Sequence, residues 1–206
     1  FRYIEVTGLK NPDLSTVSGV FVHQAVKARS AFECSDEFLN SIFRAGQMAT
    51  WSNLFWMPTD CPTREKLGWC NDAQSSCEQM LTDFETERFF AKWLQDLYDA
   101  QLPDGAMPGI VPSSGWGYGW GNGPVSDGVL FEVPYRLYLH TGETKYLIES
   151  LPYFDRYLAY LETRRDENDD ISFGLDDWAP PDYNDMVRAP FVNAVLLVKL
   201  LRIARD

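Results

Sequence analysis

The feature that most constrains the fold is a succession of six amphipathic segments with helical periodicity. From Ser35 onward, apolar residues recur every three or four positions, the spacing of one helix face. The six ranges are 35–53, 72–83, 85–101, 127–141, 143–165 and 189–204. The links between them alternate short and long, and the succession predicts a mainly α-helical chain of hairpin-like helix pairs.

Several of these segments carry more specific predictions. A Ser/Asp cap should begin the first helix, and Gly142 should end the fourth, which Pro134 should kink. The segment 189–204 is apolar nearly all round, which is typical of a helix buried between layers. Two stripes are expected to face the core, one of Phe89, Trp93 and Leu97 with Phe90 and Leu94 beside it, the other of Leu147, Leu151, Phe154, Leu158 and Leu161.

The first 28 residues follow a different period. The stretches "FRYIEVTGL" and "SGVFVHQAV" alternate loosely at period two, and "KNPDLS" between them is rich in turn-forming residues. Two strands do not make a stable sheet, so we expect them to complete a sheet whose other strands precede residue 1. The change of period predicts a domain boundary between residues 1–29 and 30–206. With no initiator Met, the chain is interpreted as a piece of a longer protein.

Charge and composition exclude several kinds of partner. A net charge of -12 disfavours nucleic acid and anionic membranes, whose phosphates would be repelled. No apolar run reaches the length of a membrane span, and the first residues lack the pattern of a signal peptide. The aromatic content of 15% suits a carbohydrate cleft, where flat rings pack on pyranose C–H faces. The four cysteines leave the compartment open, with a periplasmic or extracellular location slightly favoured.

Motif chemistry narrows the choice further. The only histidines, His23 and His140, have no Ser or Cys motif beside them, and the sequence has no phosphate-binding loop, HExxH or G-x-S-x-G. The acidic run "DENDD" at 166–170 lacks the Gly and the closing Glu of a calcium loop, and we interpret it as a solvated turn. No metal and no cofactor are therefore predicted.

What remains is a set of carboxylates in, or directly after, the three long links between helices, 54–71, 102–126 and 166–188. Each lies near a Trp or a Gly, and the link 102–126 adds Trp116, Tyr118 and Trp120 among glycines. A cleft of carboxylates and aromatic rings is typical of glycosidic-bond hydrolysis, which uses one carboxyl group as acid and a second on the opposite face. Carboxylates at helix N-termini look similar, so a structural role stays open. The candidates are Asp60, Glu65, Asp72, Asp127, Asp176 and Asp177.

One stretch is more specific than the rest. "PTDCPTREKLGWCNDAQ", beginning at Pro58, closely resembles the D-C-P-x-R-E-x-x-G-W-x-x-D-A-Q stretch of bacterial α-L-rhamnosidases of glycoside hydrolase family 78. The resemblance extends in order through "FRYIEV", "FECSDEFLNSIF", "DGAMPGIVP", "DGVLFEVPYRLYLHTGETKYL" and "DDWAPP", and so covers essentially the whole chain.

The resemblance implies an (α/α)6 barrel preceded by a β-sandwich, with about six of the twelve barrel helices in this chain. Residues 1–29 would then be the last strands of the sandwich. It implies an inverting hydrolase that releases terminal α-L-rhamnose from oligosaccharides, polysaccharides or glycosides, with Glu65 as general acid. The general base is expected beyond residue 206. The sugar pocket would be lined by Asp60, Arg64, Trp69, Asp72, Asp127, Asp177 and Trp178.

The physical chemistry of the stretch agrees with that role for Glu65. A general acid must stay protonated, and the neighbouring carboxylates Asp60 and Asp72 favour this, while Arg64 and Lys66 oppose it. Two other functions stay open: a non-catalytic carbohydrate-binding relative, and a glycosidase on the same barrel with another sugar specificity.

Overall fold

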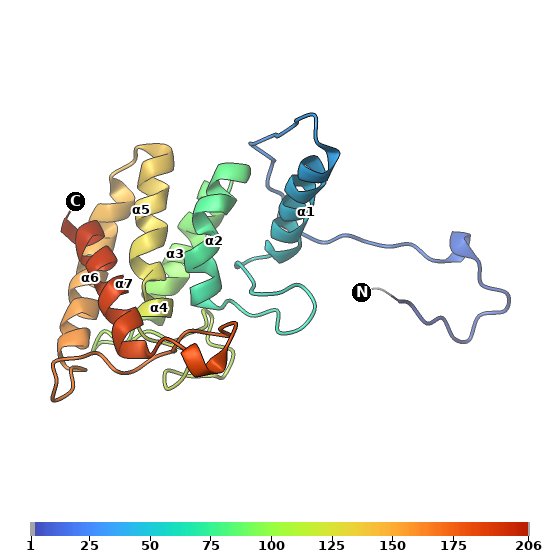
Figure 1. Cartoon of the computed structure of the whole chain (residues 1–206). Helices are drawn as coiled ribbons and strands as arrows, with labels where there is room; N and C mark the ends of the chain where they lie inside the picture. The colour runs from blue at the N-terminus through green and yellow to red at the C-terminus, as the bar shows by residue number, and fades with distance from the viewer. Residues whose placement is uncertain (1–2, 206) are drawn as a thin grey trace.

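The computed structural model describes residues 3–205, and it is mainly helical (Figure 1). All six predicted helices are confirmed, and a short helix, α4, precedes α5. Asp36 caps α1 by accepting a bond from Phe38 N–H, and Gly142, in the left-handed conformation with φ 73°, ends α5. The helices are α1 (Glu37–Asn53), α2 (Cys70–Asp83), α3 (Glu87–Ala100), α4 (Pro124–Asp127), α5 (Val129–Thr141), α6 (Lys145–Glu162) and α7 (Ala189–Arg205).

Helix α5 is the centre of the packing, in contact with α2, α3, α6 and α7. Pro134 lies inside it and is buried, as are most of its apolar side chains. The predicted α3 stripe is confirmed, because Phe89, Phe90, Trp93, Leu94 and Leu97 are all buried. The core therefore forms where α5 packs against α6, to which a short turn joins it, and against α2 and α3 from earlier in the chain.

The buried stripe of α6 agrees only in part with the predicted stripe. Phe154 and Leu161 are buried as predicted, but Leu151 is 46% exposed. The rest of the buried face consists of Tyr146, Ser150, Tyr157 and Tyr160. Phe154 stacks on Phe131 of α5 with ring centroids 4.2 Å apart, and Tyr157 meets the same ring edge-on. The burial of large aromatic side chains against α5, more than the spacing of leucines, thus determines which face of α6 is turned toward the core.

The predicted strands near the N-terminus are not formed. Within residues 3–36 the backbone is irregular, apart from a 3-10 turn at Leu14–Thr16 and an isolated bridge between Ala28 and Phe84. Most of this segment runs away from the helices (Figure 1). A strand exists only when its N–H and C=O groups pair with a neighbour, and no strand lies alongside among residues 3–205. The assignment of residues 1–29 to a β-sandwich stays a prediction, and residues 1 and 2 lie outside the described residues.

Helix α7 is not buried all round, which corrects the prediction for 189–204. Leu200 and Ile203 are buried against the other helices, and Lys199 reaches the buried Glu132 of α5, with Nζ and Oε2 2.7 Å apart. The opposite face is open to solvent, with Phe191 66% exposed. Phe38, Leu39 and Ile42 of α1 are likewise exposed. Phe191, Val195, Val198 and Leu201 of α7 thus have little cover among residues 3–205.

The long and short links lie at opposite ends of the helices. Short turns join α2 to α3 and α5 to α6 at one end, while the long links before α2, α4 and α7 gather at the other (Figure 1). This confirms the alternation seen in the sequence. The long links can build a site on a rigid helical support.

Candidate active site

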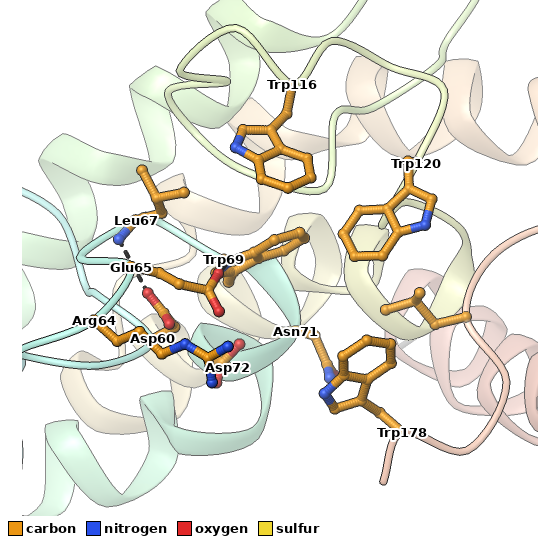
Figure 2. Close-up of a pocket in the computed structure, with 11 residues that line it drawn as sticks. Asp60, Arg64, Glu65, Leu67, Trp69, Asn71, Asp72, Trp116, Trp120 and Trp178 are labelled. Atoms are coloured by element: carbon orange, nitrogen blue, oxygen red, sulfur yellow. Dashed lines mark hydrogen bonds between the residues drawn. The ribbon is translucent and has the colours of Figure 1, made fainter.

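A pocket of about 420 Å³ lies where the three long links meet. Its lining divides into a polar wall, which comes from the link 54–69 and the start of α2, and an aromatic wall, which comes mainly from the two later links (Figure 2). The lining residues are Asp60, Arg64, Glu65, Leu67, Trp69, Asn71, Asp72, Trp116, Trp120, Leu175 and Trp178.

The part of the polar wall that carries Glu65 is a loop, which hydrogen bonds close between Asp60 and Leu67. Asp60 N–H donates to the Leu67 carbonyl, and Leu67 N–H donates to Asp60 Oδ1, both at 3.0 Å (Figure 2). Inside this loop the Glu65 N–H donates to Cys61 Sγ at 3.1 Å, and Lys66 adopts φ 57°. A left-handed conformation at a non-glycine residue is uncommon and costs free energy, so the loop holds the Glu65 side of the pocket in an unusual shape.

Two backbone bonds attach this loop to the link before α4. Val111 N–H donates to the Gly68 carbonyl and Cys70 N–H to the Gly109 carbonyl, both at 2.9 Å, around an isolated bridge between Trp69 and Ile110. Trp69 itself is only 9% exposed. The polar wall is therefore anchored to the core at the residue that opens α2.

Glu65 is brought to the pocket by this anchor. Its Oε2 accepts a bond from the Trp69 indole N–H at 2.6 Å. Arg64 lies beside it on the pocket lining and is exposed. An exposed carboxyl group held by one short bond, at the rim of a pocket, is placed to exchange a proton with a bound ligand.

Asp72 lies in the first turn of α2, on the same wall. Partial desolvation raises the pKa of its carboxyl group, and repulsion from the Asp60 carboxylate and, to a smaller extent, from Glu65 adds to the rise. The pocket thus brings three carboxyl groups close enough to influence one another, as the sequence predicted.

Four indole rings form a chain along the aromatic wall. Trp69 meets Trp116 and Trp120 edge-on, with ring centroids 5.8 and 5.4 Å apart, and Trp120 meets Trp178 edge-on at 6.2 Å. Trp178 remains 67% exposed. Such rings offer flat apolar faces to the C–H groups of a sugar.

Asp127 is not brought to the pocket. It is fully buried at the end of α4, where its Oδ2 accepts bonds from Tyr157 O–H and Gly123 N–H, both at 2.9 Å. Burial raises the pKa of this carboxyl group well above its usual range, although the two bonds oppose the rise. The structure thus places Asp127 inside the core, where it joins α4 to α6.

The two aspartates of the last link, Asp176 and Asp177, also lie outside the lining of this pocket. Asp176 caps α7, because its Oδ1 accepts the Ala189 N–H at 2.6 Å. Asp177 lies in neighbouring hollows with Trp178 and does not line the main pocket, which Trp178 does.

The structure also adds residues to the predicted set. Trp116 and Trp120 were seen in the sequence as an aromatic group, but their place beside Trp69 follows only from the fold. The third aromatic of that group, Tyr118, packs against the core and donates its O–H to the Ala100 carbonyl at 2.7 Å. Leu67, Asn71 and Leu175 complete the lining, and no sequence signal separates them from other loop residues.

No cluster of three His, Cys, Asp or Glu residues that could hold a metal ion occurs within residues 3–205. The same residues contain no helix that is long and apolar enough to cross a bilayer.

Comparison with known proteins agrees with the sequence motifs. The domain described as bacterial alpha-L-rhamnosidase 6 hairpin glycosidase domain matches residues 27–205. An alpha-L-rhamnosidase of Streptomyces avermitilis is 34% identical over 184 residues, which are 86% of this chain and 17% of that protein. The chain thus spans about one sixth of the length of this relative.

Solved structures show the same likeness. The alpha-L-rhamnosidase from Dictyoglumus thermophilum superposes with a TM-score of 0.80 at 29% identity, over 94% of this chain and 22% of that one. The Streptomyces avermitilis alpha-L-rhamnosidase complexed with L-rhamnose gives a TM-score of 0.80 at 28% identity, over 88% of this chain and 17% of that one. The chain belongs to the bacterial alpha-L-rhamnosidase six-hairpin glycosidase family.

Proposed function

We propose that this chain supplies the acid side of the active site of an inverting glycoside hydrolase that releases terminal α-L-rhamnose, with Glu65 as general acid. The observation that carries the proposal is the Glu65 carboxyl group, held by Trp69 at the edge of a pocket with a polar and an aromatic wall. Membership of the family supports the substrate class.

The two walls of the pocket suit a 6-deoxy sugar. Asp60, Asp72 and Arg64 offer charged partners for ring hydroxyls, and bonds of this kind are stronger than neutral ones. The indole rings offer apolar faces for the C–H groups and the C5 methyl group. A hexose with a hydroxymethyl group at C5 would place a polar group against that wall.

In the proposed reaction Glu65 donates its proton to the glycosidic oxygen as the bond to C1 breaks. A water molecule attacks C1 from the opposite face, and a second carboxylate, roughly 6.5–9.5 Å from the acid, takes its proton. We propose that this base comes from a part of the whole protein outside these 206 residues, since Asp127 is buried in the core. The 206 residues alone should then be inactive.

The test uses the full-length protein and a panel of nitrophenyl glycosides that includes the α-L-rhamnoside, the α-L-fucoside and the β-D-glucoside. We expect turnover of the rhamnoside, with the β anomer of rhamnose as the first product in proton NMR spectra. An α first product would contradict inversion. Preferred turnover of another glycoside would mean that the enzyme is specific for a sugar other than rhamnose. Rhamnose binding without any turnover would identify a non-catalytic relative.

A further inference from the structure

We infer that Trp69 is a positioning residue that selects which oxygen of Glu65 carries the proton, and that the 113–123 segment holds Trp69 in place through Gly121. This inference rests on the proposed role of Glu65 as acid. It gives Trp69 a role toward the carboxyl group, in addition to its place in the pocket lining.

The first observation is how little else orients the Glu65 side chain. Within residues 3–205, the Trp69 indole is the one side-chain hydrogen-bond partner of the Glu65 carboxyl group, at 2.6 Å. The Glu65 side chain is otherwise exposed, on a loop whose own bonds involve only backbone atoms, Cys61 and Asp60. A catalytic group must be held within a few tenths of an ångström of its productive position, and here Trp69 is the residue that does so.

The second observation is that Trp69 cannot move without moving its surroundings. A Cβ atom built on Gly121 would lie 2.5 Å from Cζ3 of the indole, so the ring rests directly on the Gly121 backbone. Gly121 has φ +72°, and a Cβ on Gly109 would lie 2.3 Å from the Gly121 carbonyl oxygen. The ring is thus fixed by close backbone contact on one side and by Trp116 and Trp120 on its edges.

The consequence concerns the two oxygens of the carboxyl group. Because the indole N–H donates to Oε2, a protonated Glu65 carries its proton on Oε1, the oxygen left for the pocket. When the O–H bond breaks, the proton passes to the glycosidic oxygen and the electron pair stays on Glu65 as a carboxylate. The indole bond strengthens as that negative charge develops, so Trp69 stabilises the transition state more than the ground state.

The first experiment is kinetic and uses Trp69→Phe in the full-length protein. Losing a bond to a charged group corresponds to roughly 10- to 100-fold in rate, and we expect this loss with an alkyl or sugar leaving group. The loss should be several-fold smaller with a nitrophenolate leaving group, which needs little proton donation. Trp178→Phe is the matched control, because this indole lines the same pocket and its ring contact among the described residues is with Trp120. Its loss should appear as a rise in KM of the same size for both substrates. Equal losses from Trp69→Phe on both substrates would overturn the inference.

The second experiment does not depend on activity. In full-length protein labelled with 5-fluorotryptophan, the fluorine NMR signal that is missing from Trp69→Phe belongs to Trp69. The ionisable groups near this indole on the polar wall are Glu65, Asp60, Asp72 and Arg64, with Lys66 next to Glu65 in the chain. We expect the Trp69 signal to shift with pH, to lose that shift in Glu65→Gln, and to keep it in Asp60→Asn and Asp72→Asn.

A Trp69 signal that still titrates in Glu65→Gln would overturn the inference. Full-length protein that shows the Glu65-dependent shift but does not cleave rhamnosides would sink the proposed function and leave the contact between Trp69 and Glu65 standing. Gly121→Ala, which pushes a methyl group into the indole, should reproduce the unequal loss on the two leaving groups.

Discussion

Four of the predicted carboxyl groups fall into two sets, three on the polar wall and Asp127 alone in the core, and their surroundings give them different roles. On the polar wall, Glu65, Asp60 and Asp72 line the pocket and share it with an arginine. Beneath, Asp127 is shut in the core, bonded to a tyrosine hydroxyl and a backbone amide. The sequence placed Asp127 with the first set, because all four lie in links beside Gly or Trp. Burial distinguishes a carboxyl group that can bind a ligand from one that joins two helices, and the sequence pattern did not predict which of these groups is buried.

The largest effect that separates the two sets should come from Glu65→Gln in the full-length protein. The amide keeps the shape and the bond to Trp69 but has no proton to give, so hydrolysis of unactivated rhamnosides should fall roughly 10²–10⁴-fold. Aryl rhamnosides with a nitrophenolate leaving group should lose much less. Equal losses on both substrates would mean that Glu65 only keeps the pocket in shape.

Asp127 should affect stability and not the chemistry. Asp127→Leu leaves the Tyr157 hydroxyl and the Gly123 amide without their acceptor, at roughly 1–3 kcal/mol of unfolding free energy for each. Asp127→Asn keeps an oxygen that can accept both bonds, so it should cost much less. Urea unfolding of the full-length variants measures both. A large loss of rhamnoside turnover in a stably folded Asp127→Asn would return this residue to the site.

The pH dependence of the same variants sharpens the comparison. The folded-state pKa of Asp127 is raised, so its contribution to stability is fully present below the unfolded-state pKa and is lost as pH rises through the folded-state value. The stability of wild type relative to Asp127→Asn should therefore fall as pH rises through that range. A difference that does not change with pH would mean that Asp127 is charged in the folded protein.

The sequence predicted correctly the features that depend on a local pattern of residues. Apolar periodicity located the six long helices, and the alternation of short and long links located the end that carries the pocket. Its predictions were less accurate where the structure depends on which segments pack against or pair with one another. The period-two stretches before residue 28 have no neighbouring strand among residues 3–205, and Leu151 of α6 is exposed while Tyr157 is buried.

The residues of the site divide in the same way, into those that a local motif predicts and those that only the fold brings together. Asp60, Glu65 and Asp72 are close in the chain and a short loop keeps them together, so a motif could assign them to one place. Trp116, Trp120 and Trp178 reach the same pocket from two other links. Their place depends on glycines that let backbones approach closely, such as Gly109 against Gly121, and periodicity cannot detect such contacts.

Asp72 should have a smaller effect than Glu65, on binding. Its carboxylate is expected to accept a bond from a sugar hydroxyl, so Asp72→Asn should weaken the affinity of the full-length protein for free L-rhamnose by about tenfold. Since its pKa is raised, wild-type affinity should increase as pH rises through that value, and the variant should lack this increase. Calorimetric titrations at several pH values measure both. Unchanged affinity in Asp72→Asn would leave Asp72 a purely structural role.

The smallest effect should separate two roles within Asp60. Its Oδ1 closes the loop by accepting the Leu67 N–H, while the carboxylate as a whole faces the pocket. Asp60→Asn keeps an acceptor for Leu67, so unfolding free energy should change by less than about 0.5 kcal/mol while rhamnose affinity falls. Asp60→Ala removes that acceptor as well, and should lose about 1 kcal/mol more. If both variants lose the same stability, the bond to Leu67 contributes nothing to the loop. If neither loses affinity, Asp60 serves the loop alone, and on the polar wall Asp72 and Arg64 remain to bind the sugar.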